Sequence, residues 1–341
     1  MISNKILIII LICFFSSCSS IPSLSKIEGS YSDQNEKAEI YKQANFLVAS
    51  MASASRKLHD IAWPIMKANV DVCINSRINA FGFMVADPND LQSSLKPSFL
   101  SASPNILEDN NVSPNLPMIV SVANGSPANN VNIMEGDFIV SIDNELVNYK
   151  NYKNLLIQAA KQGILKIGVK RLNKNLVYSL NSELTCGYPV QPMVSPIPNA
   201  YADGSKIYIT IATLDFIKDD QEVAFLISHE LAHNIVHYNG KGLQEIEAKP
   251  ISINDTPSLQ SVGDLFIFQS GAKETEADLL GIEYAIKAGI PQDKVANYFR
   301  RISLYMPQLM DESIFRMHPG NAKRVADIER KLKILNYKYN N

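Results

Sequence analysis

The chain has 341 residues, the length of roughly two ordinary domains. Apolar residues make up 46% of it and charged residues 19%, so it can bury a packed core and is not a disordered chain. With a net charge of −2, the chain has no basic excess to attract nucleic acid, and no nucleic-acid-binding motif occurs.

The amino terminus has the features of a signal peptide, which we assign to residues 1–17. Lys5 supplies the positive end, and residues 6–15 form an apolar run too short to span a bilayer. Small residues precede Cys18, as in a bacterial lipobox, so we expect Cys18 to be acylated. A plain secretory signal cleaved nearby is the alternative. Because no aspartate follows Cys18, we expect a lipid anchor on the periplasmic face of the outer membrane, with residues 18–32 as a flexible tether.

The cysteine count fits an exported protein. With Cys13 inside the signal peptide and Cys18 lipidated, Cys73 and Cys186 remain. In an oxidising compartment this pair predicts a disulfide, with two buried free thiols as the alternative. Such a bridge would place the ends of the intervening segment side by side, as the ends of an inserted domain must be.

The first predicted element after the tether is a helix. Apolar residues recur at helical spacing over residues 33–62, and Trp63-Pro64 breaks the pattern. We assign residues 33–72 to this N-terminal element and expect it to pack on the carboxy-terminal domain, with His59 at a surface or an interface. Residues 88–117 are rich in Asn, Ser and Pro and are predicted to form a loop or a poorly ordered segment.

Residues 73–186 are predicted to form a PDZ-like domain with a long loop. The segment "IVSVANGSPANNVNIMEGDFIVSIDNELV" resembles a PDZ domain, and an unrelated small β domain is the alternative. The resemblance implies an exposed strand to which a peptide adds as a further strand. Residues 79–87, "NAFGFMVAD", are a candidate for the loop that binds a terminal carboxylate. The predicted elements are strands at 118–123, 138–142, 146–147, 164–170 and 176–180, and a helix at 152–160.

The remaining residues, 187–341, are predicted to form a separate domain that is mostly helical. Residues 206–213 alternate apolar and polar side chains and predict a strand. A helix is expected to open at Asp220 and to end at Gly240. Further helices are predicted at 273–288, 293–306 and 322–335.

The helix that is predicted to begin at Asp220 carries "HELAH". His229 and His233 are four residues apart, so they share one face of the helix and can bind one zinc ion. Glu230 is placed to act as a general base on a zinc-activated water that attacks a peptide carbonyl. The alternative is a solvated polar face.

A catalytic zinc needs a third protein ligand. His237 is one candidate, but a straight helix cannot easily bring three successive turns to one ion. Glu274, in "KETEADLLG", is the better candidate, and Asp278 is placed to accept a hydrogen bond from a ligand histidine. Glu276 is expected to point elsewhere, and His237 to be an ordinary polar residue at a helix end.

"HELAH" followed by "ETEAD" resembles the gluzincins of metallopeptidase family forty-eight, which include CAAX prenyl proteases and HtpX- and OMA-type proteases. The segments "NAYADGSKIYIT" (199–210) and "MHPGNAKR" (317–324) resemble further family motifs. The resemblance implies an α+β fold, in which a mostly helical zincin-type metallopeptidase domain with a small sheet accompanies the inserted β-rich PDZ-like domain. It also implies residue roles: zinc ligands His229, His233 and Glu274, base Glu230, an outer carboxylate Asp278, His318 at the cleft as oxyanion donor or resting-state ligand, and Arg324 paired with an acidic group such as Asp278.

We therefore expect a zinc-dependent endopeptidase of the bacterial envelope with one Zn²⁺ per chain. By analogy with the family, it would act in protein quality control on unfolded or unassembled envelope proteins bound with the help of the PDZ-like domain. The alternative is a PDZ-based adaptor or holdase whose metallopeptidase site is latent. The sequence leaves the physiological substrate, the cleavage specificity and the oligomeric state open.

Overall fold

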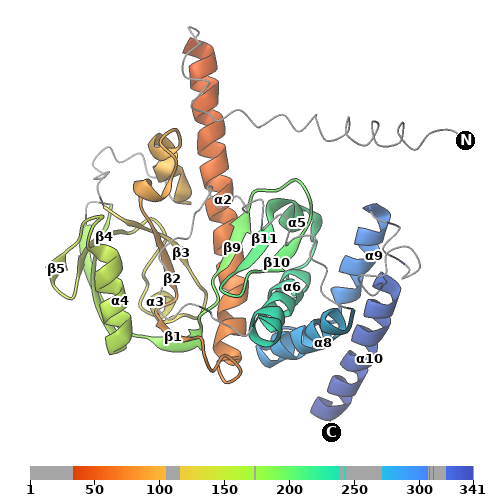
Figure 1. Cartoon of the computed structure of the whole chain (residues 1–341). Helices are drawn as coiled ribbons and strands as arrows, with labels where there is room; N and C mark the ends of the chain where they lie inside the picture. The colour runs from red at the N-terminus through yellow and green to blue at the C-terminus, as the bar shows by residue number, and fades with distance from the viewer. Residues whose placement is uncertain are drawn as a thin grey trace, which may run out of the picture.

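The computed structural model in Figure 1 describes most of the chain after residue 33. The described residues are 34–104, 116–172, 174–238, 242, 271–305, 307, 310 and 320–340. Several predictions lie outside them: the signal peptide, the tether with Cys18, the helix end at Gly240, and His318. None of the described helices is both long and apolar enough to cross a bilayer.

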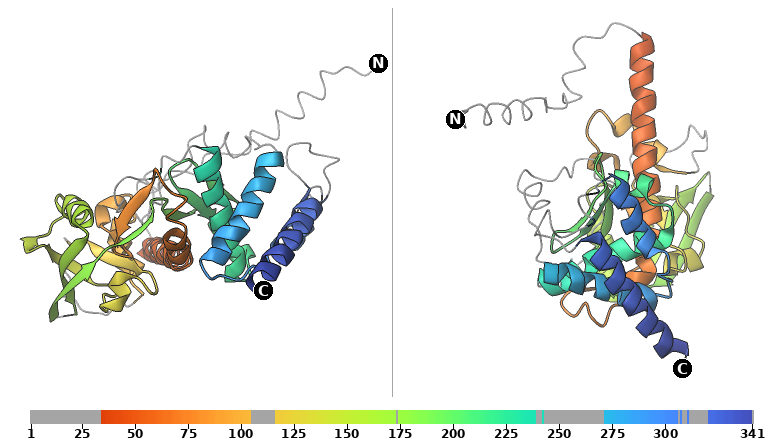
Figure 2. Two further views of the ribbon diagram at one scale, coloured as in Figure 1. Left: turned by 90° about the horizontal axis from the view of Figure 1, so that it is seen from below. Right: turned by 90° about the vertical axis from the view of Figure 1, so that its right-hand side faces the viewer.

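A long helix, α2 (Gln34–Ala68), runs through the middle of the structure. In the left view of Figure 2, which looks along its axis, α2 lies between a β-rich unit and a group of helices. The predicted end of this helix before Trp63-Pro64 is wrong, because α2 continues through Pro64. Ile65 and Met66 are buried beyond the proline, so core packing outweighs the backbone hydrogen bond that the proline removes.

The β-rich unit on one side of α2, here called the sheet unit, comprises residues 77–186. Its main sheet is antiparallel, in the strand order β2-β3-β4-β6-β7 with β5 paired to β4. A separate antiparallel pair, β1 with β8, brings the two ends of the unit side by side. The elements are β1 (Arg77–Ala80), β2 (Phe83–Ala86), β3 (Met118–Val122), α3 (Pro127–Asn130), β4 (Phe138–Ile142), β5 (Glu145–Leu146), α4 (Tyr152–Gln162), β6 (Ile164–Arg171), β7 (Lys174–Asn181) and β8 (Glu183–Cys186).

Alternate side chains of these strands point inward and build the core of the sheet unit. In β6, Leu165, Ile167 and Val169 are fully buried and face α4, whose Leu155 and Leu156 pack against the same cluster. Asp143 and Asn144 both have positive φ, of 50° and 71°, as a tight hairpin turn between β4 and β5 requires. The predicted strands and helix of this region are all confirmed, with boundaries that differ by a few residues.

The segment after β2 is more ordered than the sequence predicts. Residues 88–117 were expected to be a loop, yet they contain two short 3-10 helices, η2 (Pro88–Asp90) and η3 (Lys96–Ala102). Leu95 and Phe99 are buried against the amino-terminal half of α2. This apolar contact, which composition alone does not reveal, orders the segment. Residues 105–115 lie outside the described part of the chain.

The group of helices on the other side of α2, here called the helical unit, begins at residue 187. A three-stranded sheet in the order β10-β11-β9 lies beside its first long helix, and β9 and β11 pair in parallel. The short strands β9 and β10 were not predicted. The elements are β9 (Val190–Met193), β10 (Ala200–Ala202), β11 (Ile207–Thr210), α5 (Ile211–Phe216), α6 (Asp220–Ala232), the π-turn η4 (His233–His237), α8 (Gly271–Lys287), α9 (Val295–Tyr305) and α10 (Asn321–Asn340).

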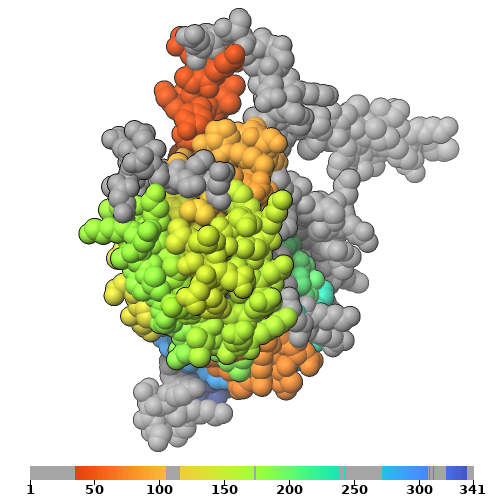
Figure 3. Space-filling model, turned by 90° about the vertical axis from the view of Figure 1, so that its left-hand side faces the viewer, coloured from red at the N-terminus to blue at the C-terminus, as the bar shows by residue number. Residues whose placement is uncertain are grey.

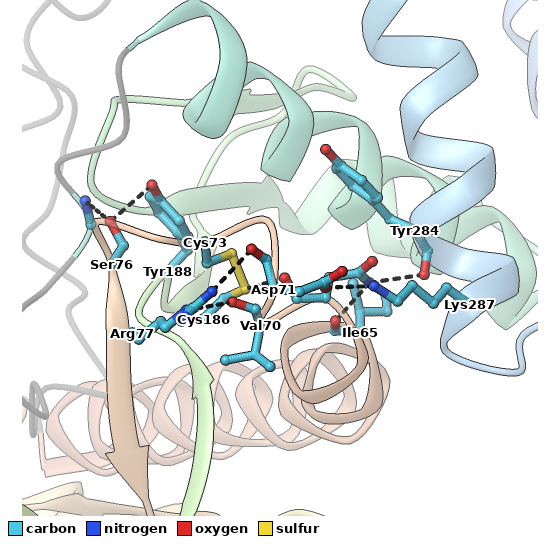
Figure 4. Close-up of a disulfide and its surroundings, with 12 residues drawn as sticks. Ile65, Val70, Asp71, Cys73, Ser76, Arg77, Cys186, Tyr188, Tyr284 and Lys287 are labelled. Atoms are coloured by element: carbon cyan, nitrogen blue, oxygen red, sulfur yellow. Dashed lines mark hydrogen bonds and ion pairs between the residues drawn. A yellow bond between two sulfur atoms is a disulfide. The ribbon is translucent and has the colours of Figure 1, made fainter.

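A disulfide joins Cys73 to Cys186 at the junction of the two units, which confirms the predicted pair. Figure 4 shows its surroundings, where Ser76 donates a hydrogen bond to the Tyr188 hydroxyl at 3.0 Å. The two Cα atoms are 5.5 Å apart. The chain therefore leaves α2 and returns to the helical unit at nearly the same point.

Helix α2 contributes to two hydrophobic cores. Val48 and Met51, in its amino-terminal half, are buried with β3 and η3 of the sheet unit. Leu58 and Ile65, further along, are buried with α6 and α8 of the helical unit. In Figure 3, which shows the outer face of the sheet unit, the amino-terminal end of α2 projects beyond the remaining described residues.

Candidate metal centre

Helix α6 is buried along most of its length, so its polar residues face the protein interior. Asp219 caps the helix, and its carboxylate accepts a hydrogen bond from the backbone N–H of Gln221 at 3.0 Å. His229, Glu230 and His233 are less than a tenth exposed although they carry polar side chains. Buried polar groups need partners, and the partners come from α8 and α10.

The structure brings together one nitrogen from each histidine and the carboxylate of Glu274. His233 Nε2 lies 3.1 Å from His229 Nε2 and 3.3 Å from Glu274 Oε1, and His229 Nε2 lies 3.7 Å from Glu274 Oε2. A tetrahedral zinc with bonds of about 2.0–2.1 Å places its ligand atoms about 3.3 Å apart. The residues present therefore fit a zinc ion in both donor chemistry and spacing.

Glu274 reaches the histidines because α8 packs very closely on α6. The contact is made at Gly281, where an added Cβ would lie 2.9 Å from the His229 backbone nitrogen. Only glycine allows this approach without displacing backbone. Glu274 is two turns before Gly281 on α8 and is 6% exposed.

Asp278 and Arg324 form the next layer around the histidines. Asp278 Oδ1 lies 3.0 Å from His229 Nδ1 in a bent contact, on the side of the ring away from Glu274. Arg324, on α10, donates two hydrogen bonds to the Asp278 carboxylate, at 2.8 and 2.7 Å. Its guanidinium also lies 3.6 Å from Glu274. Although burial alone would raise it, the charge of Arg324 lowers the pKa of Asp278, so this carboxylate is ionised.

Glu230 has a different electrostatic environment from that of its neighbours. Burial raises its pKa to about 7, and the negative charge of Glu274 acts in the same direction. The positive charges of His229 and Arg324, and a hydrogen bond from the Ala202 backbone, oppose this shift. A carboxyl group with a pKa near neutrality is suited to accept a proton and release it again.

The β10–β11 hairpin is tied to the metal-site helix by Asn234, whose role the sequence did not suggest. Asn234 is fully buried, and its amide oxygen accepts a hydrogen bond from Gly204 N–H at 2.7 Å. Its amide nitrogen donates to the Lys206 carbonyl at 3.0 Å. This residue fixes the hairpin, and with it Ala202, against the helix that carries Glu230.

His237 is not an isolated polar residue at a helix end, as the sequence suggests. Its Nδ1 lies 2.8 Å from His233 Nδ1, and its Nε2 lies 3.2 Å from Glu276 Oε2. His237 thus approaches His233 from the side opposite to Glu274 and is not one of the three clustered groups. Burial lowers its pKa, which favours the neutral ring.

His59 is buried against the sheet unit, so the alternative of a surface position is wrong. Its Nδ1 lies 2.8 Å from the Ser121 hydroxyl of β3. It therefore lies at the interface between α2 and the sheet unit, far along the chain from the metal-site helix.

Comparisons with known proteins bear on part of this site. The model of Peptidase family M48 matches residues 167–244. The M48 match contains His229, Glu230 and His233 and ends before Glu274. It supports a metallopeptidase in this part of the chain. No curated protein matches the chain.

Among the solved structures that the chain matches is the HtrA3 PDZ domain bound to a phage-derived ligand (FGRWV). The two share 22% sequence identity, with a TM-score of 0.24. The similarity covers 33% of this chain and 91% of that structure.

Proposed function

We propose that the chain is a zinc-dependent endopeptidase of the bacterial cell envelope. The observation that carries this proposal is the cluster of His229, His233 and Glu274, whose ligand atoms lie within 4.8 Å of one another. The two histidines lie within the residues that the M48 model matches, and Glu274 lies beyond them in the sequence. The zincin-type arrangement of the helical unit is part of the same proposal. Three buried groups with these spacings suit a divalent cation better than a structural hydrogen-bond network.

Each residue has a distinct proposed role in peptide hydrolysis. Zinc, when bound, would polarise the attacking water and the scissile carbonyl. Glu230 takes a proton from the water and then delivers it to the leaving amine. Asp278 and Arg324 hold His229 in position, because Arg324 fixes Asp278 by two hydrogen bonds. The hairpin β10–β11 beside α6 offers an edge along which an extended substrate would lie.

Two conservative variants test this proposal. Glu230→Gln should lower cleavage of an unfolded protein such as casein by roughly 10²–10⁴-fold and leave zinc content unchanged, because it removes only the proton acceptor. Glu274→Gln should lose zinc as well as activity, because it removes a ligand. Zinc content is measured on the purified full chain. Full cleavage by Glu230→Gln, or zinc retained by Glu274→Gln with unchanged affinity, would refute the assigned roles.

We further propose that the sheet unit binds substrate peptides in the manner of a PDZ domain. Among the described residues, β2 pairs only with β3 and so lies at an edge of the main sheet. A cavity of about 120 Å³ borders this strand, lined by Phe83 of β2, Leu156 of α4 and Trp63 of α2. Gly82, in the predicted carboxylate-binding segment, has a φ of +79° and lines the same cavity. A peptide paired with β2 would place an apolar side chain there.

The peptide-binding role and the adaptor alternative are separated by excision of the sheet unit. Ala80 of β1 pairs with Glu183 of β8, so Asn-Gly can replace residues 81–182 and close a hairpin. The shortened chain also carries Val48→Ser and Met51→Ser, because the excision exposes these apolar side chains of α2. The shortened chain should cleave short peptides and should lose most cleavage of unfolded proteins. An adaptor with a latent site would instead show no chelator-sensitive cleavage in the intact chain. Equal losses on both substrates would contradict a docking role.

The proposed location rests on Cys18, which lies outside the described residues. We propose a lipid anchor at Cys18 on the periplasmic face of the outer membrane, and a role in the quality control of unfolded or unassembled envelope proteins. A palmitate analogue should label the wild-type chain in cells and should not label Cys18→Ala. Labelling that survives this substitution would place the lipid elsewhere.

A further inference from the structure

A chain of side-chain contacts extends from the proposed metal ligand His233 to the protein surface. His233 Nδ1 contacts His237 Nδ1 at 2.8 Å, and His237 Nε2 contacts Glu276 Oε2 at 3.2 Å. The side chain of His237 is 4% exposed, whereas that of Glu276 is 55% exposed. The two residues therefore form an inner and an outer link, and neither contributes to the three-residue cluster.

With a metal ion held by His233, the positions of the hydrogen atoms along this chain would be fixed. His233 Nε2 faces Glu274 and His229, so it must offer its lone pair to a metal ion and its proton must be on Nδ1. His233 Nδ1–H then donates to His237 Nδ1. His237 must carry its own proton on Nε2, from which it donates to Glu276. Every donor in this chain meets one acceptor, in a single arrangement of two neutral rings and one carboxylate.

The local backbone makes this contact possible. Tyr238 N–H donates to the His233 carbonyl at 3.1 Å, five residues back, as in a π-helix. This π-turn widens the end of the helix and sets the two rings at 53° to each other, with their centroids 4.9 Å apart. The nitrogen atoms can therefore meet edge to edge rather than stacking as parallel rings.

We propose that His237 and Glu276 are positioning residues of the metal site, which hold the His233 ring in its metal-binding orientation. This inference depends on the proposed metal site. It assigns to His233 an outer partner that corresponds to Asp278 at His229, so that each ligand histidine is held from its far nitrogen. Loss of such a partner leaves the ring free to rotate and its tautomer undefined, which weakens metal binding.

Zinc affinity of the full chain, measured by competition with a chelator, tests the proposal. His237→Phe should weaken zinc binding by roughly 10–100-fold, the usual cost of losing an outer partner. Glu276→Ala should weaken it less, because this carboxylate is 55% exposed and acts only through His237. The double variant should bind zinc no more weakly than His237→Phe alone, because both residues act along one chain. Glu283→Ala, on the same helix, is the matched control.

Two further measurements separate positioning from a general loss of folding. His237→Asn keeps an acceptor near the position of Nδ1, so it should recover much of the affinity that His237→Phe loses. In the cobalt-substituted protein, His237→Phe should alter the visible absorption spectrum, whereas Glu283→Ala should not. Thermal unfolding of the metal-free chains shows whether the fold is kept.

The possible outcomes are distinct. His237→Phe that binds zinc within about twofold of wild type, or independent and additive effects of His237→Phe and Glu276→Ala, would overturn the inference and leave the proposed function intact. If His237→Phe does not fold, His237→Ala takes its place, and a zinc affinity of this variant equal to that of wild type would also overturn the inference. A wild-type chain that binds no zinc would refute the proposed function and this inference together.

Discussion

Buried charged residues around the proposed metal site are balanced in different ways. The charge of Asp278 is balanced by Arg324, which donates two hydrogen bonds to its carboxylate. Burial alone would lower the pKa of Arg324, but the negative charges of Asp278 and Glu274 raise it. Burial also acts to raise the pKa of Glu274, but its contacts with His233, His229 and Arg324 lower it. Glu230 is less well compensated, and its pKa rises to about 7.

His59 makes the stability of the protein depend on pH. Burial lowers its pKa from 6.5 to about 4, so the folded protein keeps it neutral while the unfolded chain takes up a proton below pH 6.5. The unfolded state therefore gains stability as the pH falls. Between about pH 7 and pH 4, the free energy of unfolding should fall by about 3 kcal/mol because of this residue alone.

The measurement compares wild type with His59→Asn by urea unfolding across this pH range. Asparagine can still hydrogen-bond to Ser121 and does not titrate. All other titrating groups are shared, so the difference between the two curves isolates His59. Parallel curves would show that His59 is protonated in the folded protein or open to solvent.

At the level of residues, the sequence predicts only what regular helix spacing determines. His229 and His233 follow from four-residue spacing, and Glu274 with Asp278 from the same spacing on a second helix. His237 was misjudged because its contact depends on a π-turn, which the sequence does not reveal. Its place four residues after His233 was the available signal.

The α6–α8 pair is the element on which the metal site depends. The two helices approach closely at Gly281, where a Cβ would meet three backbone atoms of residues 228 and 229 at 2.9 to 3.3 Å. Backbone at this distance cannot move aside as the end of a flexible side chain can. The position of Glu274 relative to the histidines is thus set by a residue that has no polar group.

Gly281→Ala should move α8 away from α6 and weaken zinc binding. The added methyl group should cost about 1–3 kcal/mol of stability through overpacking, and the better helix propensity of alanine offsets about 1 kcal/mol of it. Zinc affinity should fall because Glu274 is displaced from His233. Glu283→Ala, at a side chain that is 41% exposed and pairs with Lys331, should leave affinity unchanged. If Gly281→Ala binds zinc like wild type, helix spacing does not control the site.

Elements were predictable where their pattern was local. The strands around Asp143-Asn144 and the helix α4 follow from alternation and turn residues, and the structure confirms them. The strands β8, β9 and β10 were missed, because they are only three or four residues long and depend on partners distant in sequence. The passage of α2 through Pro64 was missed for the same reason, since only the buried contacts of Ile65 and Met66 favour it.

At the scale of the whole molecule, the disulfide joins residues separated by 113 positions. In the chain-entropy model a bridge over this loop stabilises the folded state by about 5 kcal/mol. Reduction of the metal-free protein should lower the free energy of unfolding by about this amount, measured by urea unfolding. The Cys73→Ser/Cys186→Ser variant should match the reduced wild type and should not respond to reductant. Coinciding wild-type curves with and without reductant would contradict this stabilisation.

The sequence predicts a β-rich part and a helical part, because the cysteine pair and the change in residue pattern after residue 117 both indicate such a division. The shared role of α2 was not accessible. One helical face serves both cores, and the apolar pattern of α2 gives no sign of which partner each stretch contacts.

The length of α2, roughly 50 Å, has a consequence for how such a protein can be divided or recombined. Its two halves are buried in different cores, so any cut between residues 68 and 187 leaves one unit without part of its interior. Neither unit has a complete hydrophobic core without α2. To graft the helical unit onto another protein, one would have to carry along Leu58 and Ile65 and cover the apolar surface of Val48 and Met51 that the missing neighbour once shielded.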